Sequence, residues 1–298
     1  MLKAEDLIAT TQQTDNHLGY LFWFSIGSQM VETDELKRKL IGSGLEEDWM
    51  PRRIRSVDAF RRATKEVERK RPTENPKIYE NLLVREVFSD EKMIQRNLVV
   101  EQVNQNDKKL GYETEVAIIR LDKAKGTIYC EVKGSDISEI CNEIKEKYYL
   151  YKNHYTSQHV RVMVSKILGS LAPTPMRENG VIYFVPRSMG DRVKMLVAFI
   201  RSLENSDAYY VPVVDSSDTR YMVNKRLSDH LDGLLNQCKH LDNLRNDQIK
   251  SLVEETNRAI RDFNEYTGLI DSEQEVYRTK IKMLRNEVFR IMNDVLSN

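Results

Sequence analysis

The last quarter of the chain places the strongest constraint on its fold. From about Thr219 onward, apolar or small residues recur in steps of three and four wherever the series is unbroken, as along one side of an α-helix. The first series comprises Leu227, Leu231, Leu234, Cys238, Leu241, Leu252, Thr256, Ala259 and Phe263. Gly268 interrupts it, and the second comprises Tyr277, Ile281, Leu284, Val288, Ile291 and Val295. The pattern predicts two helices folded back as an antiparallel, coiled-coil-like hairpin over residues 219–298.

The two predicted helices differ in length, about 70 Å for the first and about 40 Å for the second. The second therefore covers only the distal part of the first. The proximal seam, from Leu227 to Leu244, must pack either on the rest of the chain or on another chain, because soluble monomers rarely expose so much contiguous apolar surface. We expect a projecting arm that forms a homo-oligomer through a seam of Leu227, Leu231, Leu234 and Leu241.

Composition indicates a soluble protein without a global electrostatic field. The 298 residues are 40% hydrophobic and 31% charged, with a formal net charge of zero. Cys130, Cys141 and Cys238 have no short spacing, which favours buried thiols in a reducing cytosol over a disulfide or a zinc site. No apolar run approaches the roughly 20 residues of a membrane span, and the first residues lack a secretion signal. We expect a cytoplasmic protein with no cofactor, no metal and no membrane contact.

The middle of the chain changes to a period of two. Residues 82–90, 92–104, 112–122 and 126–134 read as four strands of a mostly antiparallel meander, with a hairpin turn over residues 122–126. Near the start, residues 20–26 read as a buried strand or as the apolar start of a helix. The predicted fold class is α+β, an antiparallel sheet with packed helices followed by the helical hairpin.

These patterns divide the chain into three predicted segments. Residues 1–75 form a helical and aromatic segment with a basic helix. Residues 76–218 form an α+β body, whose short strands around the helix beginning at Ser188 are compatible with a winged-helix-like part and equally with a generic α+β core. Residues 219–298 form the hairpin arm.

The most basic segment spans residues 52–71. A helix beginning at Ser56 would bury a stripe that includes Phe60 and Val67 and leave its arginines in solvent. Either these cations contact nucleic-acid phosphates or they pair with acidic groups elsewhere in this neutral chain. The candidate contacts are Arg52, Arg53, Arg55, Arg61, Arg62 and Lys65. A second tract, with Tyr148, Tyr149, Tyr151 and Tyr155, suits either base stacking or the edge of a core.

One set of residues raises the question of metal-dependent cleavage. Asp122, Glu131 and Lys133 loosely match a nuclease arrangement in which two carboxylates hold Mg²⁺ and a lysine assists the attacking water. Glu131 and Lys133 share one face of their strand, although a cross-strand ion pair explains the same pattern. No other catalytic motif is present, neither a zinc-protease helix nor a dinucleotide fingerprint. The sequence thus gives no firm indication of an enzyme.

Three pieces of sequence carry a family resemblance: HLGYLFWFS from His17, WMP from Trp49 followed by DAFRRAT from Asp58, and GVIYFVP from Gly180. Together they resemble an uncharacterised family found in phages, plasmids and related mobile elements. The resemblance implies a setting, an accessory protein of a mobile element, and brings no activity or catalytic residues. Proteins of that kind bind host factors, including antiviral defence complexes, or handle the element's nucleic acid.

We therefore expect a non-enzymatic, self-associating interaction protein that binds and blocks a host protein such as a defence component. The first alternative is a nucleic-acid-binding accessory protein that uses residues 52–71. The second is the nuclease built on Asp122, Glu131 and Lys133.

Overall fold

A computed structural model describes residues 17–132, 137–177, 181–241, 244–269 and 274–294. The chain forms two compact units. The first unit contains residues up to 29, residues 35–50 and residues from 157 onward, and the second contains residues 30–34 and 51–156. The predicted three-segment division is not followed, because the boundary at 75 falls inside the second unit and the boundary at 218 inside the first.

The second unit is built on a five-stranded antiparallel sheet in the order β3-β4-β5-β6-β7. Its strands are β3 (Arg69–Pro72), β4 (Ile78–Ser89), β5 (Met93–Asn104), β6 (Lys109–Asp122) and β7 (Thr127–Val132). The four predicted strands are confirmed in order and pairing, and β3 is added at the edge beside β4. Strand alternation explains this success, since one face of each strand must be apolar to pack.

The turn between β6 and β7 also forms where the sequence predicts it. Gly126 has a φ of 62°, and its N–H donates to the Asp122 carbonyl at 2.8 Å. The Asp122 carboxylate accepts the N–H groups of Ala124 at 3.0 Å and Lys125 at 2.9 Å. A residue with a Cβ would be strained at Gly126, so glycine fixes the end of this hairpin.

Two helices cover one face of this sheet, α2 (Ser56–Lys65) and α3 (Ser138–Asn153). The predicted stripe of α2 is confirmed, because Phe60, Ala63 and Val67 are all fully buried in a core with Ile144 and Tyr148 of α3. The unit also contains a short antiparallel pair, β2 (Met30–Glu32) with β8 (His154–Thr156).

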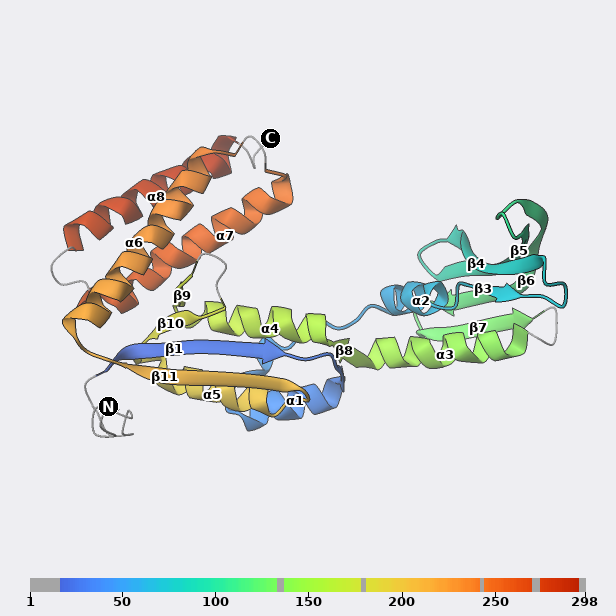
Figure 1. The fold of residues 1–298 in the computed structure, drawn as a ribbon, viewed down its shortest axis with the longest axis horizontal. Coiled ribbons are helices and arrows are strands. Elements are labelled where there is room, and N and C mark those ends of the chain that lie inside the picture. Colours follow the sequence, from blue (N-terminus) through green and yellow to red (C-terminus); the bar gives the residue numbers. More distant parts are fainter. Residues whose placement is uncertain (1–16, 133–136, 178–180, 242–243, 270–273, 295–298) are drawn as a thin grey trace, which may run out of the picture. The chain divides into compact units, whose positions relative to one another are not determined.

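The first unit contains a four-stranded sheet in the order β11-β1-β10-β9. Its strands are β1 (His17–Ile26), β9 (Thr174–Pro175), β10 (Tyr183–Pro186) and β11 (Ser206–Val214). Residues 20–26 therefore form a strand and not the start of a helix. Three helices belong to the same unit as this sheet, namely α1 (Thr33–Gly42), α4 (Ser157–Gly169) and α5 (Gly190–Arg201), and α4 and α5 contact β1 (Figure 1). Because β10 and β11 both pair with β1 and not with each other, this region is not the winged-helix-like part that we expected.

Two of the three resemblance pieces meet in this sheet. Gly19 of β1 lies opposite Pro186 of β10, and Phe22 lies opposite Tyr183. A Cβ on Gly19 would lie 2.6 Å from a ring atom of Phe184, so glycine permits the close approach of these two strands. The pairing of these strands thus explains why Gly19 stands within the first piece.

The C-terminal region contains three helices where the sequence predicts two. They are α6 (Ser217–Lys239), α7 (Asn246–Asp262) and α8 (Gln274–Asp294), with the short 3-10 helix η5 (Phe263–Leu269) after α7. The predicted continuous first helix is interrupted at His240, which leaves the helical conformation with φ −122° and ψ 76°. The interruption coincides with a gap in the apolar series, which has no member between Leu241 and Leu252.

The three helices lie side by side (Figure 1). The Tyr277 hydroxyl donates to the Asn224 carbonyl at 2.7 Å, and Arg290 donates to the Cys238 carbonyl at 3.0 Å. From the first contact to the second, the residue number increases along both helices, so α6 and α8 are parallel. The α7 helix runs back between their ends, as a short connection requires.

The predicted seam is buried by its own chain. Leu227, Leu231 and Leu234 are at most 5% exposed, and the half-buried Leu241 packs on the same core. The expectation that these residues await a second chain is therefore wrong. Its physical cause is the break at His240, which allows α7 and α8 together to cover the length of α6.

The cysteines also depart from expectation. Cys130 of β7 and Cys141 of α3 form a disulfide, with Cα atoms 6.2 Å apart, whereas Cys238 is a buried free thiol. The prediction of three thiols is wrong for this pair because α3 folds back against β7, a contact that the spacing of 11 residues does not indicate. Among the described helices, none combines the length and the apolar character that a membrane crossing requires.

Burial of the seam makes a stability prediction. Leu231→Ala should lower the free energy of unfolding by about 2–5 kcal/mol, because it leaves a cavity between α6 and its neighbours. Urea denaturation followed by circular dichroism measures this change. The control Phe289→Ala, at a side chain 70% exposed, should change it by less than about 0.5 kcal/mol. An unchanged unfolding free energy, accompanied by dissociation of an oligomer in light scattering, would instead identify the seam as a contact between chains.

Candidate functional site

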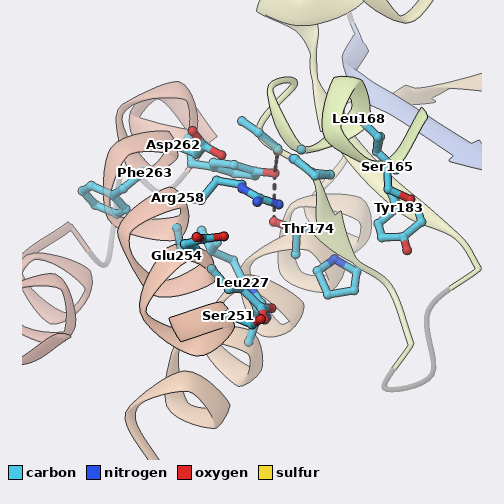
Figure 2. A pocket seen from close by; sticks show the side chains of 18 residues that line it. Ser165, Leu168, Thr174, Tyr183, Leu227, Ser251, Glu254, Arg258, Asp262 and Phe263 are labelled. Atoms are coloured by element: carbon cyan, nitrogen blue, oxygen red, sulfur yellow. Dashed lines mark hydrogen bonds between the residues drawn. The ribbon is translucent and has the colours of Figure 1, made fainter. Parts of the chain in front are cut away.

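A cavity of about 560 Å³ lies within the first unit. Its walls come from the end of α4, the segment leading into β9, the start of β10, the middle of α6, the outer face of α7 and the 3-10 helix η5 (Figure 2). The lining residues used below are Leu168, Gly169, Ala172, Thr174, Tyr183, Leu227, His230, Glu254, Glu255, Arg258, Asp262, Phe263 and Tyr266. A cavity of this size is typical of small-ligand sites.

One side of the cavity is fixed by Tyr266. This side chain is 2% exposed; its hydroxyl donates to the Ala172 carbonyl at 2.7 Å and accepts from the Thr174 hydroxyl at 2.8 Å (Figure 2). Burial raises the pKa of Tyr266 well above its usual value, so the hydroxyl stays protonated and keeps donating. These bonds join η5 to the segment that leads into β9, and they hold this part of the lining in place.

Arg258 reaches from α7 toward the end of α4 (Figure 2). A Cβ on Gly169 would lie 2.6 Å from one guanidinium nitrogen and 3.0 Å from Cζ, so the guanidinium rests directly against the glycine. The carbonyl end of a helix attracts a cation, which favours this position. Within the described part of the chain, no side chain or carbonyl forms a hydrogen bond or an ion pair with Arg258.

Three carboxylates of α7 line the same space. Glu254 and Glu255 are exposed, and neither has a hydrogen bond or ion-pair partner among the residues that the structure describes. Asp262 is only 14% exposed and accepts from the Arg261 Nε at 2.9 Å. Burial is the main cause that raises the pKa of Asp262, and Arg261 and Arg258 partly oppose it.

Two polar rings flank Glu255. Burial lowers the pKa of His230, although the negative charge of Glu255 acts in the opposite direction. Burial raises the pKa of Tyr183, and Glu255 adds to this effect. Both rings are therefore neutral near pH 7 and serve as hydrogen-bonding groups. Together with the apolar wall of Leu168, Leu227 and Phe263, the arrangement suits binding of a small polar ligand.

The cations of the basic segment are largely paired. Four of the six nucleic-acid candidates form ion pairs: Arg55 with Asp58 at 2.7 Å, Arg61 with Glu86 at 2.9 Å, Arg62 with Glu66 at 3.0 Å, and Lys65 with Glu68. Arg52 and Arg53 are exposed ahead of α2. The segment thus forms a charged surface helix with paired cations, which is one of the two interpretations of the sequence. A phosphate would have to compete with a carboxylate for each of these four cations.

The tyrosine tract is mostly core. Tyr148, Tyr151 and Tyr155 are at most 9% exposed, and Tyr149 is 46% exposed. The Tyr148 hydroxyl donates to the Gly126 carbonyl at 2.8 Å, and the Tyr155 hydroxyl donates to the Pro51 carbonyl at 3.1 Å. A base cannot stack on rings that are buried in this way.

The structure does not bring the nuclease candidates together. Asp122 lies opposite Thr127, and Glu131 lies opposite Ile118, so four residues separate the two carboxylates along the ladder, roughly 13 Å. Asp122 holds the turn, and Glu131 pairs with Arg120 at 3.3 Å. Lys133 lies outside the described residues. In the described ranges, no group of three or more His, Cys, Asp or Glu side chains is arranged to hold a metal ion.

A second surface in the first unit is not among the site residues predicted from the sequence. Trp23 of β1 stacks on Tyr209 of β11, with ring centroids 5.6 Å apart and planes inclined by 25°. Val211 lies next along this face, opposite the half-buried Leu21. Tyr209 is 45% exposed and Val211 39% exposed. We name Leu21, Trp23, Tyr209 and Val211 the aromatic surface. From the sequence, the cluster of Tyr20, Phe22, Trp23 and Phe24 fits a binding platform but is more typical of a core.

The comparisons with known proteins give a family. A family model described as a family of unknown function, DUF6744, matches residues 17–295. The chain belongs to this family. No curated protein and no solved structure matches it. The DUF6744 match contains both units, the cavity and the aromatic surface, and it agrees with the resemblance in pointing to an uncharacterised family.

The buried carboxyl of Asp262 makes a pH-dependent prediction. Because its folded pKa is raised, folded protein holds this proton to higher pH than the unfolded chain does, so the group lowers stability as pH rises from about 4. Asp262→Asn should therefore gain stability relative to the natural chain as the pH rises from about 4 to 7. Urea denaturation at several pH values measures the difference. Asp247→Asn, a carboxylate 71% exposed, is the control. A difference that is constant over this range would contradict the assignment.

Proposed function

We propose that this protein is a non-enzymatic binding protein of a phage or mobile element that binds, and thereby blocks, a protein of the host cell. The observation that carries the proposal is the aromatic surface, in which the half-buried Trp23 stacks on Tyr209, a ring 45% exposed, on a sheet face. Trp and Tyr side chains are enriched among the residues that dominate protein–protein binding energy. The host setting is supported by the resemblance to mobile-element proteins.

The neighbouring sheet edge favours a partner that docks on the face. Pro212 of β11 lacks an N–H, and Arg201 donates to the Ala208 carbonyl at 2.9 Å. The Pro212 nitrogen and the Ala208 carbonyl are therefore two backbone groups of β11 that cannot pair with an added strand. Strand addition is therefore disfavoured, and a folded partner surface fits better than an extended peptide.

The proposed interaction does not use the predicted arm. The seam residues are core, so self-association through them is not part of the proposal. The basic segment is also a weaker candidate, because ion pairs such as Arg61 with Glu86 already satisfy most of its cations. In the aromatic surface, Tyr209 contacts Trp23 and the Arg201 guanidinium, 5.3 Å from its ring centroid, and still remains 45% exposed.

The test has two stages. Affinity capture from host cells identifies an enriched protein, and calorimetry with the purified pair measures its affinity. Trp23→Ala and Tyr209→Ala should each weaken binding by about tenfold or more, because each removes a large contact ring. Tyr221→Ala, at a tyrosine of α6 that is 69% exposed, should leave the affinity unchanged. Equal binding by all three variants, with folding intact by circular dichroism, would refute a role for this surface.

A further inference from the structure

The cavity of the first unit contains unpaired charges of both signs. Arg258, Glu254 and Glu255 all line it, and none of them has an ion-pair partner within the described ranges. All three side chains are exposed, whereas other exposed charges are paired, as in Arg55 with Asp58 and Arg61 with Glu86. The cavity is therefore a place where charged groups remain available to a ligand.

The local geometry explains why these groups stay apart. Glu254 and Arg258 are four residues apart on α7, a spacing at which glutamate and arginine commonly pair on a helix surface. Here the guanidinium instead rests against Gly169 at the end of α4. The backbone positions of the two glutamates and of Arg258 thus lie about one helical turn apart on α7, roughly 5 Å along its axis.

The charges exclude simple ligand classes. A phosphate or other pure anion would meet Arg258 but would be repelled by Glu254, Glu255 and the nearby Asp262. A pure cation would be attracted by the carboxylates but would meet the guanidinium. A wholly apolar molecule would leave all of these charges without partners, which is costly once water is displaced. A ligand with one charge of each sign complements the whole set.

We propose that the cavity binds a small zwitterion of the amino-acid class, with a carboxylate and an ammonium group close together. Arg258 binds the carboxylate through its planar pair of N–H donors, and Glu254 or Glu255 accepts the ammonium. The neutral ring of His230 offers a further hydrogen bond. Leu168, Leu227 and Phe263 contact the remainder of the ligand. The volume of about 560 Å³ accommodates a free amino acid or a dipeptide. This inference is independent of the host-protein interaction.

The experiment uses the full chain and defined probes. The twenty free amino acids and a set of dipeptides are screened by thermal shift, and those that stabilise the protein are titrated by calorimetry. We expect saturable binding by at least one of them. Its N-acetyl and its carboxamide derivatives, which each lack one charge, should bind about 10-fold to 100-fold more weakly, as expected for loss of a charge-assisted hydrogen bond. These derivatives test the proposal on the natural chain, without any variant.

Variants of the cavity residues test which side chain binds the carboxylate of the ligand and which binds its ammonium group. Arg258→Gln should weaken binding of the free amino acid about tenfold or more while hardly affecting the carboxamide. Glu255→Gln together with Glu254→Gln should weaken binding of the free amino acid to a similar extent while hardly affecting the N-acetyl derivative. The controls are Arg278→Gln and Glu275→Gln on α8, which form an exposed pair at 2.8 Å and should leave binding unchanged. The proposal is overturned if no probe binds below about 10 mM. It is equally overturned if the blocked derivatives bind as well as the free zwitterion, or if binding survives Arg258→Gln.

Discussion

The packing of α7 back against α6 is the constraint on which the rest of the first unit depends. Thr256 of α7 is fully buried, and its hydroxyl lies 3.6 Å from the Cys238 sulfur of α6. With Ile249 and Leu252, it forms the inner face of α7 in the common core. The opposite face of the same helix carries Glu254 and Arg258 into the cavity (Figure 2), and Glu255 lines the cavity as well. One amphipathic helix thus closes the core on one side and provides the charged wall of the cavity on the other.

Local patterns predicted much of the fold, because they depend on neighbours in the sequence. The strands of the second unit, the turn at Gly126 and the buried stripe of α2 each follow from a short period or a single turn residue. The break at His240 did not follow. The apolar series continues on both sides of it, and nothing in the series states whether a helix passes through a polar interval or ends there. That one error converted a buried seam into a supposed interface.

The site residues were beyond sequence reasoning for a related reason. The sequence shows the local partners of the basic segment but not the distant ones: Glu86 is 25 residues from Arg61, and Glu143 is 74 residues from Arg69. In the cavity, residues whose sequence spacing suggests pairing are unpaired in the structure. Glu254, Glu255 and Arg258 look like an ordinary charged helix, and only the position of Gly169 at the end of α4 separates their charges. Pairing is a property of the folded chain, and composition fixes only the net charge of zero.

The same packing also accounts for the aromatic surface. The helical core reaches the four-stranded sheet at Phe184 and Val213, which it buries, while Leu21 is only partly covered. Trp23 and Tyr209 lie farther along β1 and β11, away from that contact, and there the sheet face stays open. A partly exposed aromatic pair on a sheet loses little conformational entropy when a partner binds, because the two rings already stack. The position of the C-terminal helices thus decides both where the cavity forms and which part of the sheet remains available, so one unit presents two chemically different surfaces.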